Sequence, residues 1–173
     1  MSNRIIRLGG SHIGNSNSIQ NLNQFLAKSK NRNFVVVSAI PAVLNLIEES
    51  LLQVFQKNES SFDLAEILNG FYTEKAGNPI SAEYQKLVEQ LTNLLKGIAL
   101  IGDYSRSLKD QVLSFSEKLS VEILKAQWSK LSVEVEIAWP EQIELLTTSD
   151  FGNSTFLSVN QEKLSQLSNS IVL

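Results

Sequence analysis

Two short apolar runs near the start of the chain predict buried β-strands. Residues 5–8 carry three apolar side chains and end at a glycine pair, and residues 34–37 are a run of Phe and Val that ends before Pro41. Continuous runs of this kind are typical of parallel strands covered on both faces of the sheet. Between them, apolar residues recur at helical spacing over 19–26, after a stretch rich in N-cap residues at 15–18. The order strand, glycine turn, helix, strand predicts a βαβ unit.

The middle of the chain has a helical hydrophobic pattern over most of its length. Apolar residues recur every three or four positions through 42–127, which predicts a helical layer. A cluster of turn-forming residues indicates a break between helices, and it consists of Gly70, Gly77, Asn78 and Pro79. Beyond this layer, residues 133–137 alternate apolar and acidic side chains, which predicts a half-exposed strand, and 145–146 and 171–173 predict two further short strands.

These elements together predict an α/β fold. We expect a layered αβα sandwich whose mainly parallel sheet begins with strands at 4–8 and 34–39, with helices on its faces. No internal repeat or low-complexity linker interrupts the pattern, so we expect one domain over 1–173.

Composition and charge narrow the classes of function. The 173 residues include 15 Lys and Arg against 18 Asp and Glu, a net charge of −3, which argues against a nucleic-acid binder held by bulk charge. The chain has no cysteine and one histidine, His12, which excludes a disulfide scaffold, a thiol nucleophile and Cys-rich metal sites, and we expect no metal site. No apolar run is long enough to cross a bilayer and the first residues do not resemble a signal peptide. We therefore expect a cytoplasmic protein without a membrane partner.

A few residues could carry chemistry, each with a purely structural alternative. Gly9 and Gly10 follow the first strand and precede a helix, where backbone N–H groups can bind an anion, or they form only a tight strand exit. Arg7 could hold a phosphate through its guanidinium, or it is a solvated charge. Glu117 lies between hydroxyl residues on a predicted helix and could accept an ammonium group, or it faces solvent on an amphipathic helix.

Five segments in order resemble the N-terminal half of aspartate kinases in the amino-acid kinase family. Residues 5–14 are similar to the opening strand and glycine loop, usually V-x-K-F-G-G-T-S-V, and 35–40 are similar to V-V-V-S-A-M. The stretch 97–105 resembles the kinase part of bifunctional aspartokinase–homoserine dehydrogenases. Residues 114–120 are similar to S-F-G-E-R-L-S, and 147–153 to T-D-D-x-F-G-x. The resemblance covers nearly the whole chain and implies the N-terminal lobe of the amino-acid kinase fold.

The resemblance implies a reaction and its participants. Family members use ATP and Mg²⁺ to phosphorylate the side-chain carboxylate of L-aspartate, an in-line transfer that depends on positioning and positive charge. Arg7 stands at the position of the family's catalytic lysine, and Gly9 with Gly10 matches the phosphate loop. Glu117 matches the glutamate that binds the substrate ammonium group, and Ser38 matches a serine that lines the substrate site. Phe151 and Gly152 match a further substrate-binding motif.

The chain also departs from the family pattern. Arg7 replaces a lysine, and the planar guanidinium does not reproduce a compact ammonium. Gln142 stands where the family has an arginine that clamps the α-carboxylate of aspartate. The glycine-rich T-L-G-R-G-G-S-D motif of the family's nucleotide-binding half and its regulatory ACT domains are not found in these residues. We therefore expect a truncated, aspartate-side portion that is inactive alone and binds neither ATP nor Mg²⁺ tightly.

Two other interpretations stay open. A degenerate, non-catalytic aspartokinase homologue could act as a binding or interaction module, which the residues at 7 and 142 favour. Another amino-acid kinase, acting on glutamate or a nucleotide, explains the segment 114–120 less well. In each case an exposed strand edge or apolar face would favour self-association, so we expect a homo-oligomer.

Overall fold

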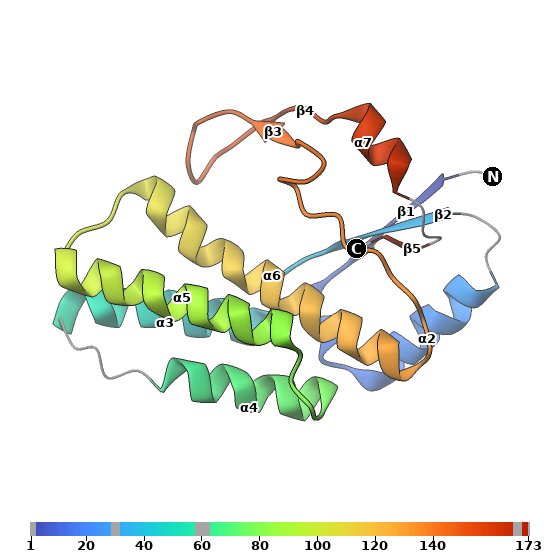
Figure 1. Cartoon of the computed structure of the whole chain (residues 1–173), viewed down its shortest axis with the longest axis horizontal. Coiled ribbons are helices and arrows are strands. Elements are labelled where there is room, and N and C mark those ends of the chain that lie inside the picture. Colours follow the sequence, from blue (N-terminus) through green and yellow to red (C-terminus); the bar gives the residue numbers. More distant parts are fainter. Residues whose placement is uncertain (1–2, 29–31, 58–62, 168–170, 173) are drawn as a thin grey trace.

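The computed structural model describes residues 3–28, 32–57, 63–167 and 171–172 and arranges them as a small parallel sheet beside a bundle of long helices (Figure 1). Within these ranges the elements follow in the order β1 (Asn3–Leu8), α1 (Gly10–Ile13), α2 (Ser16–Ala27), β2 (Arg32–Val37), α3 (Pro41–Lys57), α4 (Leu64–Ala76), α5 (Ala82–Ile101), α6 (Arg106–Lys130), β3 (Leu146–Thr147), β4 (Phe156–Ser158), α7 (Gln161–Gln166) and β5 (Ile171–Val172).

The sheet confirms the predicted α/β class and the parallel βαβ unit. Its order is β1-β2-β5, with both neighbouring pairs parallel, and Ile5 lies opposite Phe34 in the register of the first pair. Leu8 and Val35 are buried in the core, whereas Ile5 is 77% exposed and Val36 is 55% exposed. The prediction that both faces are covered is therefore wrong for the outer face of β1 and β2, since alternate residues of a strand point to opposite faces.

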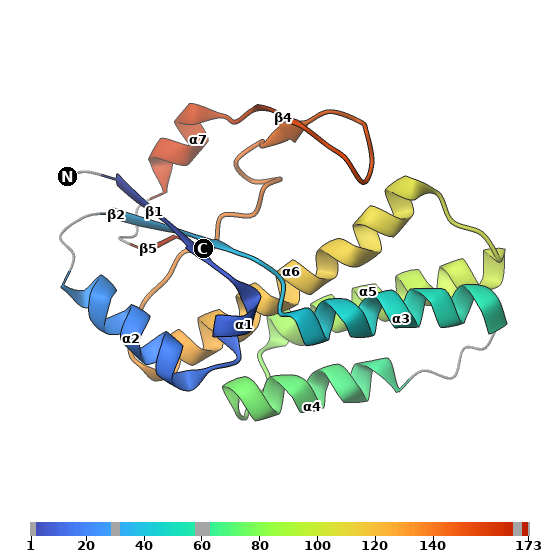
Figure 2. The same cartoon turned by 180° about the vertical axis from the view of Figure 1, so that it is seen from behind.

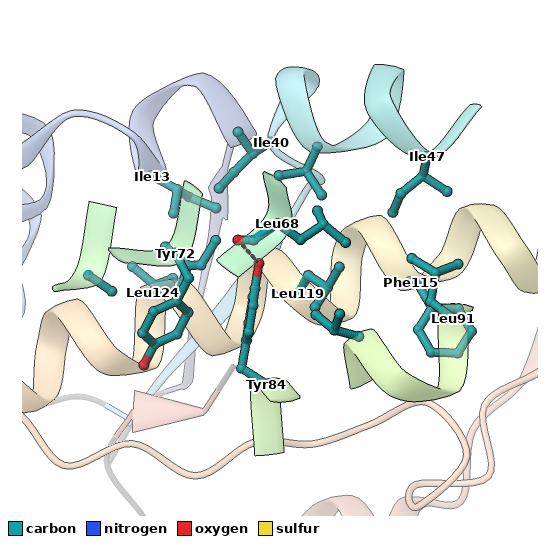
Figure 3. Packing of buried hydrophobic residues seen from close by; sticks show 14 of the residues in the cluster. Ile13, Ile40, Ile47, Leu68, Tyr72, Tyr84, Leu91, Phe115, Leu119 and Leu124 are labelled. Atoms are coloured by element: carbon teal, nitrogen blue, oxygen red, sulfur yellow. Dashed lines mark hydrogen bonds between the residues drawn. The ribbon is translucent and has the colours of Figure 1, made fainter. Parts of the chain in front are cut away.

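The helical layer predicted for 42–127 is confirmed and contains most of the core. Helix α6 is in contact with α3, α4 and α5, so its buried side chains are shared among three neighbours. Figure 3 shows Ile47, Leu91 and Leu119 packed between these helices, and Tyr84 donates a hydrogen bond of 2.8 Å to the carbonyl oxygen of Leu68. Burial raises the pKa of Tyr84, so this hydroxyl keeps its proton and remains a donor.

Capping residues define the helix boundaries. The side chains of Asn15, Ser81 and Ser105 each accept a hydrogen bond from a backbone N–H in the first turn of α2, α5 and α6, respectively. Of the predicted turn cluster, Gly77 ends α4 with a positive φ of 77°. Gly70 does not belong to this turn, because it lies inside α4. A single glycine within a helix costs only about 1 kcal/mol, which the packing of the helix can offset.

The segment after α6 crosses to the other side of the sheet. Figures 1 and 2 both show α7 and the hairpin of β3 and β4 on the side of the sheet opposite α2. Residues 133–137 do not form the predicted strand: only Glu136 takes part in a β-bridge, although Val133 and Val135 pack on the core as the alternation predicted. A strand needs a partner along its length, and apolar alternation alone does not supply one. The strand predicted at 145–146 is found as β3, and the one at 171–173 as β5, while Leu173 lies outside the described residues.

Candidate functional site

The first part of the site is the edge where β1 and β2 end. Leu8 ends β1 and Val37 ends β2, and the Ser38 backbone N–H donates to the Leu8 carbonyl oxygen at 3.1 Å. This bond continues the parallel ladder by one step and holds Ser38 beside the glycine pair. The structure therefore brings the sequence-predicted residues Gly9, Gly10 and Ser38 to one edge of the sheet, which is where ligands bind in open parallel α/β sheets.

Gly10 has a packing role at this edge. A Cβ atom built at Gly10 would overlap the carbonyl group of Ala39 and the backbone nitrogen of Ile40. The backbones at 10 and 39–40 can approach this closely only if residue 10 is glycine. Gly9 precedes the four-residue helix α1, and its carbonyl oxygen accepts from the His12 N–H at 2.9 Å. Phosphate binding by this pair stays a prediction.

Helix α6 is bound to the same edge through Ser120. The Ser120 hydroxyl accepts a hydrogen bond of 2.9 Å from the backbone N–H of Ile40 and donates one of 2.6 Å to the carbonyl oxygen of Ser116. Both serines are fully buried, so these bonds are shielded from water. The contact fixes α6 against the turn after β2 and thereby sets where Glu117 lies relative to Ser38.

Glu117 lies on the exposed side of α6 beside a large cavity. Its Oε2 atom lies 3.1 Å from the Ser116 hydroxyl, whose single proton makes a shorter bond of 2.6 Å to the Leu113 carbonyl oxygen. The next residue, Lys118, pairs with Glu141 at 3.0 Å and ties the segment after α6 to the helix. Partial burial raises the pKa of Glu141, but hydrogen bonds from its own backbone N–H and from Lys118 outweigh burial and lower it below its usual range.

The tip of the hairpin is bound to the first half of α6. The backbone N–H of Gly152 donates to Oδ2 of Asp110 at 2.7 Å, and Gly152 has a φ of 82°, which favours glycine. Phe151 beside it is partly exposed. Asp110 and Glu117 are two helical turns apart, or about 10 Å along the axis, on the same side of α6. Phe151 and Gly152 therefore lie over the helix face that carries Glu117.

The two residues that depart from the family pattern lie apart from these contacts. Arg7 is exposed on the outer face of β1, opposite Val36 in the register, and it does not line the cavity. Gln142 is exposed and its Oε1 atom accepts a hydrogen bond of 3.2 Å from the Trp139 backbone N–H, which closes a local turn. Gln142 thus has a structural role where the resemblance would place a carboxylate clamp.

A cavity of about 890 Å³ lies between the outer face of the sheet, α6 and the segment after α6. Glu117 and Lys118 line it from α6, and Phe156 lines it from β4. The sequence did not indicate this cavity, because its walls are residues far apart in the chain. It also did not indicate Asp110 or Ser120, whose functions depend on contacts with Gly152 and Ile40.

In the described part of the chain, no group of three or more His, Cys, Asp or Glu side chains is arranged to hold a metal ion. Among the helices of the described ranges, none has both the length and the apolar character needed to cross a bilayer.

Comparisons with known proteins relate the chain to aspartokinases. No protein-family model matches it. It is 25% identical to chloroplastic aspartokinase 1 of Arabidopsis thaliana over 159 residues, which cover 88% of this chain and 28% of that protein. Escherichia coli aspartokinase III in complex with lysine and aspartate (T-state) superposes with a TM-score of 0.69 at 19% identity. The same enzyme in complex with aspartate and ADP (R-state) gives 0.68 at 17% identity.

The coverage is unequal in every comparison. Each of the two structures covers 95% of this chain, but the chain covers only 36% of each of them. The chain therefore spans about a third of the length of the relatives it matches. In sequence and in fold, this chain is similar to a part of the aspartokinases.

Proposed function

We propose that this chain is the aspartate-binding portion of an aspartokinase-like protein. The observation that carries the proposal is the placement of Glu117 and Ser38: Ser120 binds α6 to the turn after β2, so both residues lie at the edge of the sheet where the strands end. The related aspartokinase III structures are complexes with aspartate, which supports this ligand class. The family reaction is ATP-dependent phosphorylation of the aspartate side-chain carboxylate.

Each site residue has a proposed role in holding aspartate. The exposed Glu117 carboxylate accepts a charge-assisted hydrogen bond from the substrate ammonium group. Ser38 offers a hydroxyl at the same edge, and the loop at Phe151 and Gly152 is held by Asp110 on the side of α6 that carries Glu117. Gly9 and Gly10 would face the transferred phosphoryl group. Arg7, at the family's lysine position, lies apart from them on the outer face of β1.

ATP and Mg²⁺ are the co-substrates that the family resemblance implies. We propose that the nucleotide-binding function of such kinases belongs to the remainder of the relatives' length. This chain alone is then expected to make no aspartyl phosphate, and a hydroxamate assay with aspartate and Mg-ATP tests this: a clear ATP-dependent product would contradict it.

Calorimetric titration with L-aspartate tests the binding site directly. The chain is expected to bind aspartate, and Glu117→Gln is expected to abolish the heat because it removes the charge that faces the ammonium group. Glu89→Gln on the exposed side of α5 is the matched control and should leave binding unchanged. Equal binding by Glu117→Gln and the unmodified chain would remove the proposed role of Glu117.

A second function is supported by the residues at 7 and 142. We propose as the alternative a degenerate, non-catalytic homologue that acts as a binding or interaction module. The Gln142 side chain closes a turn and leaves no cation for the α-carboxylate at that position. In this case the titration gives no heat with aspartate, with or without Mg-ATP.

The cytoplasmic location expected from the sequence stays a prediction, since one relative is named as chloroplastic.

A further inference from the structure

The large cavity has an apolar floor, which is the outer face of the sheet. Ile5, Phe34 and Val36 project onto this face, and Val121 of α6 and Leu164 of α7 stand around it. Most of its accessible lining is apolar, and its volume of about 890 Å³ lies within the range of roughly 300–1,000 Å³ that is typical of small-molecule sites. The shape and chemistry fit a ligand with an apolar body.

Arg32 supplies a cation to this apolar cavity. It is the first residue of β2, lines the cavity, and its guanidinium lies 5.1 Å from the centre of the Phe34 ring. The Nε and Nη2 atoms of Arg32 are buried and donate no hydrogen bond within the part of the chain that the structure describes. Unpaired buried donors are rare in folded proteins, and leaving a charged one unpaired is costly. An occupant that brings a hydrogen-bond acceptor would remove this cost.

The two unpaired nitrogens select a particular acceptor. Nε and Nη2 lie on the same edge of the guanidinium group, and their N–H bonds run parallel. A carboxylate accepts both in a bidentate pair, which is stronger and more directional than a single hydrogen bond. The edge is closed to solvent in this conformation. Arg32 lines the cavity, and its flexible side chain must therefore rotate so that the Nε and Nη2 edge of the guanidinium faces the ligand.

We propose that this cavity is a binding site for an alkyl carboxylate, a fatty acid of medium length, with the carboxylate on Arg32 and the alkyl chain along Phe34, Ile5 and Val36. Glu117 lines the same cavity, but the proposed carboxylate contact at Arg32 lies at the other end of β2 from it. Arg32 begins β2, whereas Glu117 belongs to a helix bound to Ile40, beyond the other end of that strand. The inference does not depend on the proposed function, and the two can fail independently.

Titration with decanoate, below the concentration at which it forms micelles, tests the proposal. We expect one decanoate per chain, with a negative heat-capacity change because apolar surface is buried. Decanol, which has the same chain without the charge, should bind about tenfold more weakly or worse, and Arg32→Met should weaken decanoate binding to the same level. Arg4→Met is the matched control, since Arg4 lies over the Phe25 ring at 4.9 Å and does not line the cavity.

Two further variants separate the possible outcomes. Val36→Trp should block decanoate by filling the cavity at a position that is already half-exposed. Glu117→Gln should weaken decanoate binding far less than Arg32→Met, because Glu117 lines the cavity away from Arg32. Loss of aspartate binding and loss of decanoate binding are thereby distinguished. Equal decanoate binding by Arg32→Met and the unmodified chain would overturn the proposal. Absence of decanoate binding by the unmodified chain would also overturn it. If that chain is a dimer and Val36→Trp dissociates the dimer, the outer face of the sheet is instead a contact between two copies.

Discussion

Ser120 is the residue on which the position of the candidate site depends most directly. Its hydroxyl is the acceptor for the backbone N–H of Ile40, and both residues are buried. Ser120→Ala would leave that N–H without a partner, so we expect the free energy of unfolding to fall by about 1–3 kcal/mol. Urea unfolding measures this. Ser114→Ala, which removes only a local bond to the Gln111 carbonyl, should change stability by less than about 0.5 kcal/mol. Equal effects of the two substitutions would show that the Ser120 contact is not stabilising.

Glu122 is a buried carboxyl whose charge opposes folding. The residue is only 3% exposed, and its Oε2 atom accepts no hydrogen bond from the described residues. Burial raises the pKa of Glu122, and the negative charge of Glu83 raises it further. The positive charge of Lys125, whose Nζ atom lies 3.9 Å from Oε2 of Glu122, lowers it in part. The folded state binds the Glu122 proton more tightly than the unfolded state does. The contribution of Glu122 to the free energy of unfolding therefore falls as the pH rises from its pKa in the unfolded chain, near 4.5, through its raised pKa in the folded protein.

Glu122→Gln should therefore stabilise the protein at neutral pH, by about 1 kcal/mol, since it removes a poorly paired buried charge. The difference from the unmodified chain should shrink on acidification, as Glu122 itself becomes protonated. Thermal unfolding of both proteins across the acidic and neutral range measures this. A difference that is constant with pH would mean that Glu122 does not titrate differently in the folded state.

Individual site residues could be identified from the sequence only where they belong to a short, recognisable motif. Ser38 and Glu117 were found because each stands in a short segment that resembles aspartate kinases, and Gly10 because it follows a strand. Asp110 and Arg32 were not found, since one is defined by its contact with Gly152, 42 positions away, and the other by a cavity whose walls come from distant segments. No local pattern encodes such contacts.

At the scale of elements, the approach of α1 to the loop after β2 requires glycine at position 10. Gly10→Ala would place a methyl group onto the Ala39 carbonyl, and the two backbones would have to separate. We expect a loss of several kcal/mol or failure to fold, as overpacking against rigid backbone is costly. Gly97→Ala in α5 meets no atom and should instead stabilise by about 0.5–1 kcal/mol. Denaturant unfolding of the pair gives the comparison, and an unchanged midpoint for Gly10→Ala would contradict the structure.

The hairpin of β3 and β4 depends on one anchor at its tip. Asp110→Ala removes the acceptor for the Gly152 N–H, so residues 146–158 should exchange amide hydrogens faster and be cleaved more readily by protease. Global stability should change by less than about 1 kcal/mol, because β3 and β4 contribute no side chain to the main core. Asp103→Ala, which loses only the bond to the adjacent Tyr104 N–H, is the control. Protection of the hairpin that is equal in both variants would contradict this role.

The helices and strands could be predicted from the hydrophobic pattern where their apolar residues face the core and, for strands, where a neighbouring strand pairs with them. The strands at 5–8 and 34–37 and the long helices were predicted because their apolar residues face a core that the structure confirms. The pattern at 133–137 placed Val133 and Val135 against the core, as observed, but no neighbouring strand pairs with the segment along its length. The outer face of β1 and β2 was predicted to be covered because apolar runs are ambiguous: they do not say what lies on each face.

At the scale of the whole molecule, exposed apolar side chains gather at two places. One is the outer face of the sheet with the nearby hairpin, and the other is the end of the helical layer. Figure 1 shows α3 and α5 ending at the same end of the molecule. Leu100 and Ile101, in the last turn of α5, are 89% and 74% exposed, and the Phe55 ring of α3 lies 5.2 Å from that of Tyr104. Exposed apolar groups of this kind favour association with a partner.

The expected homo-oligomer is therefore tested best at the end of the helical layer. Sedimentation equilibrium should show an average mass that rises with protein concentration, and Ile101→Lys should shift the protein toward the monomer because a lysine there would be desolvated in the contact. Leu157→Lys, on the exposed hairpin, is the control and should leave association unchanged. A monomer at the highest concentration would contradict the prediction. If Leu157→Lys dissociates the oligomer and Ile101→Lys does not, the contact between the copies lies at the hairpin. The second copy would then cover the outer face of the sheet and its cavity, which would not be open to a small ligand.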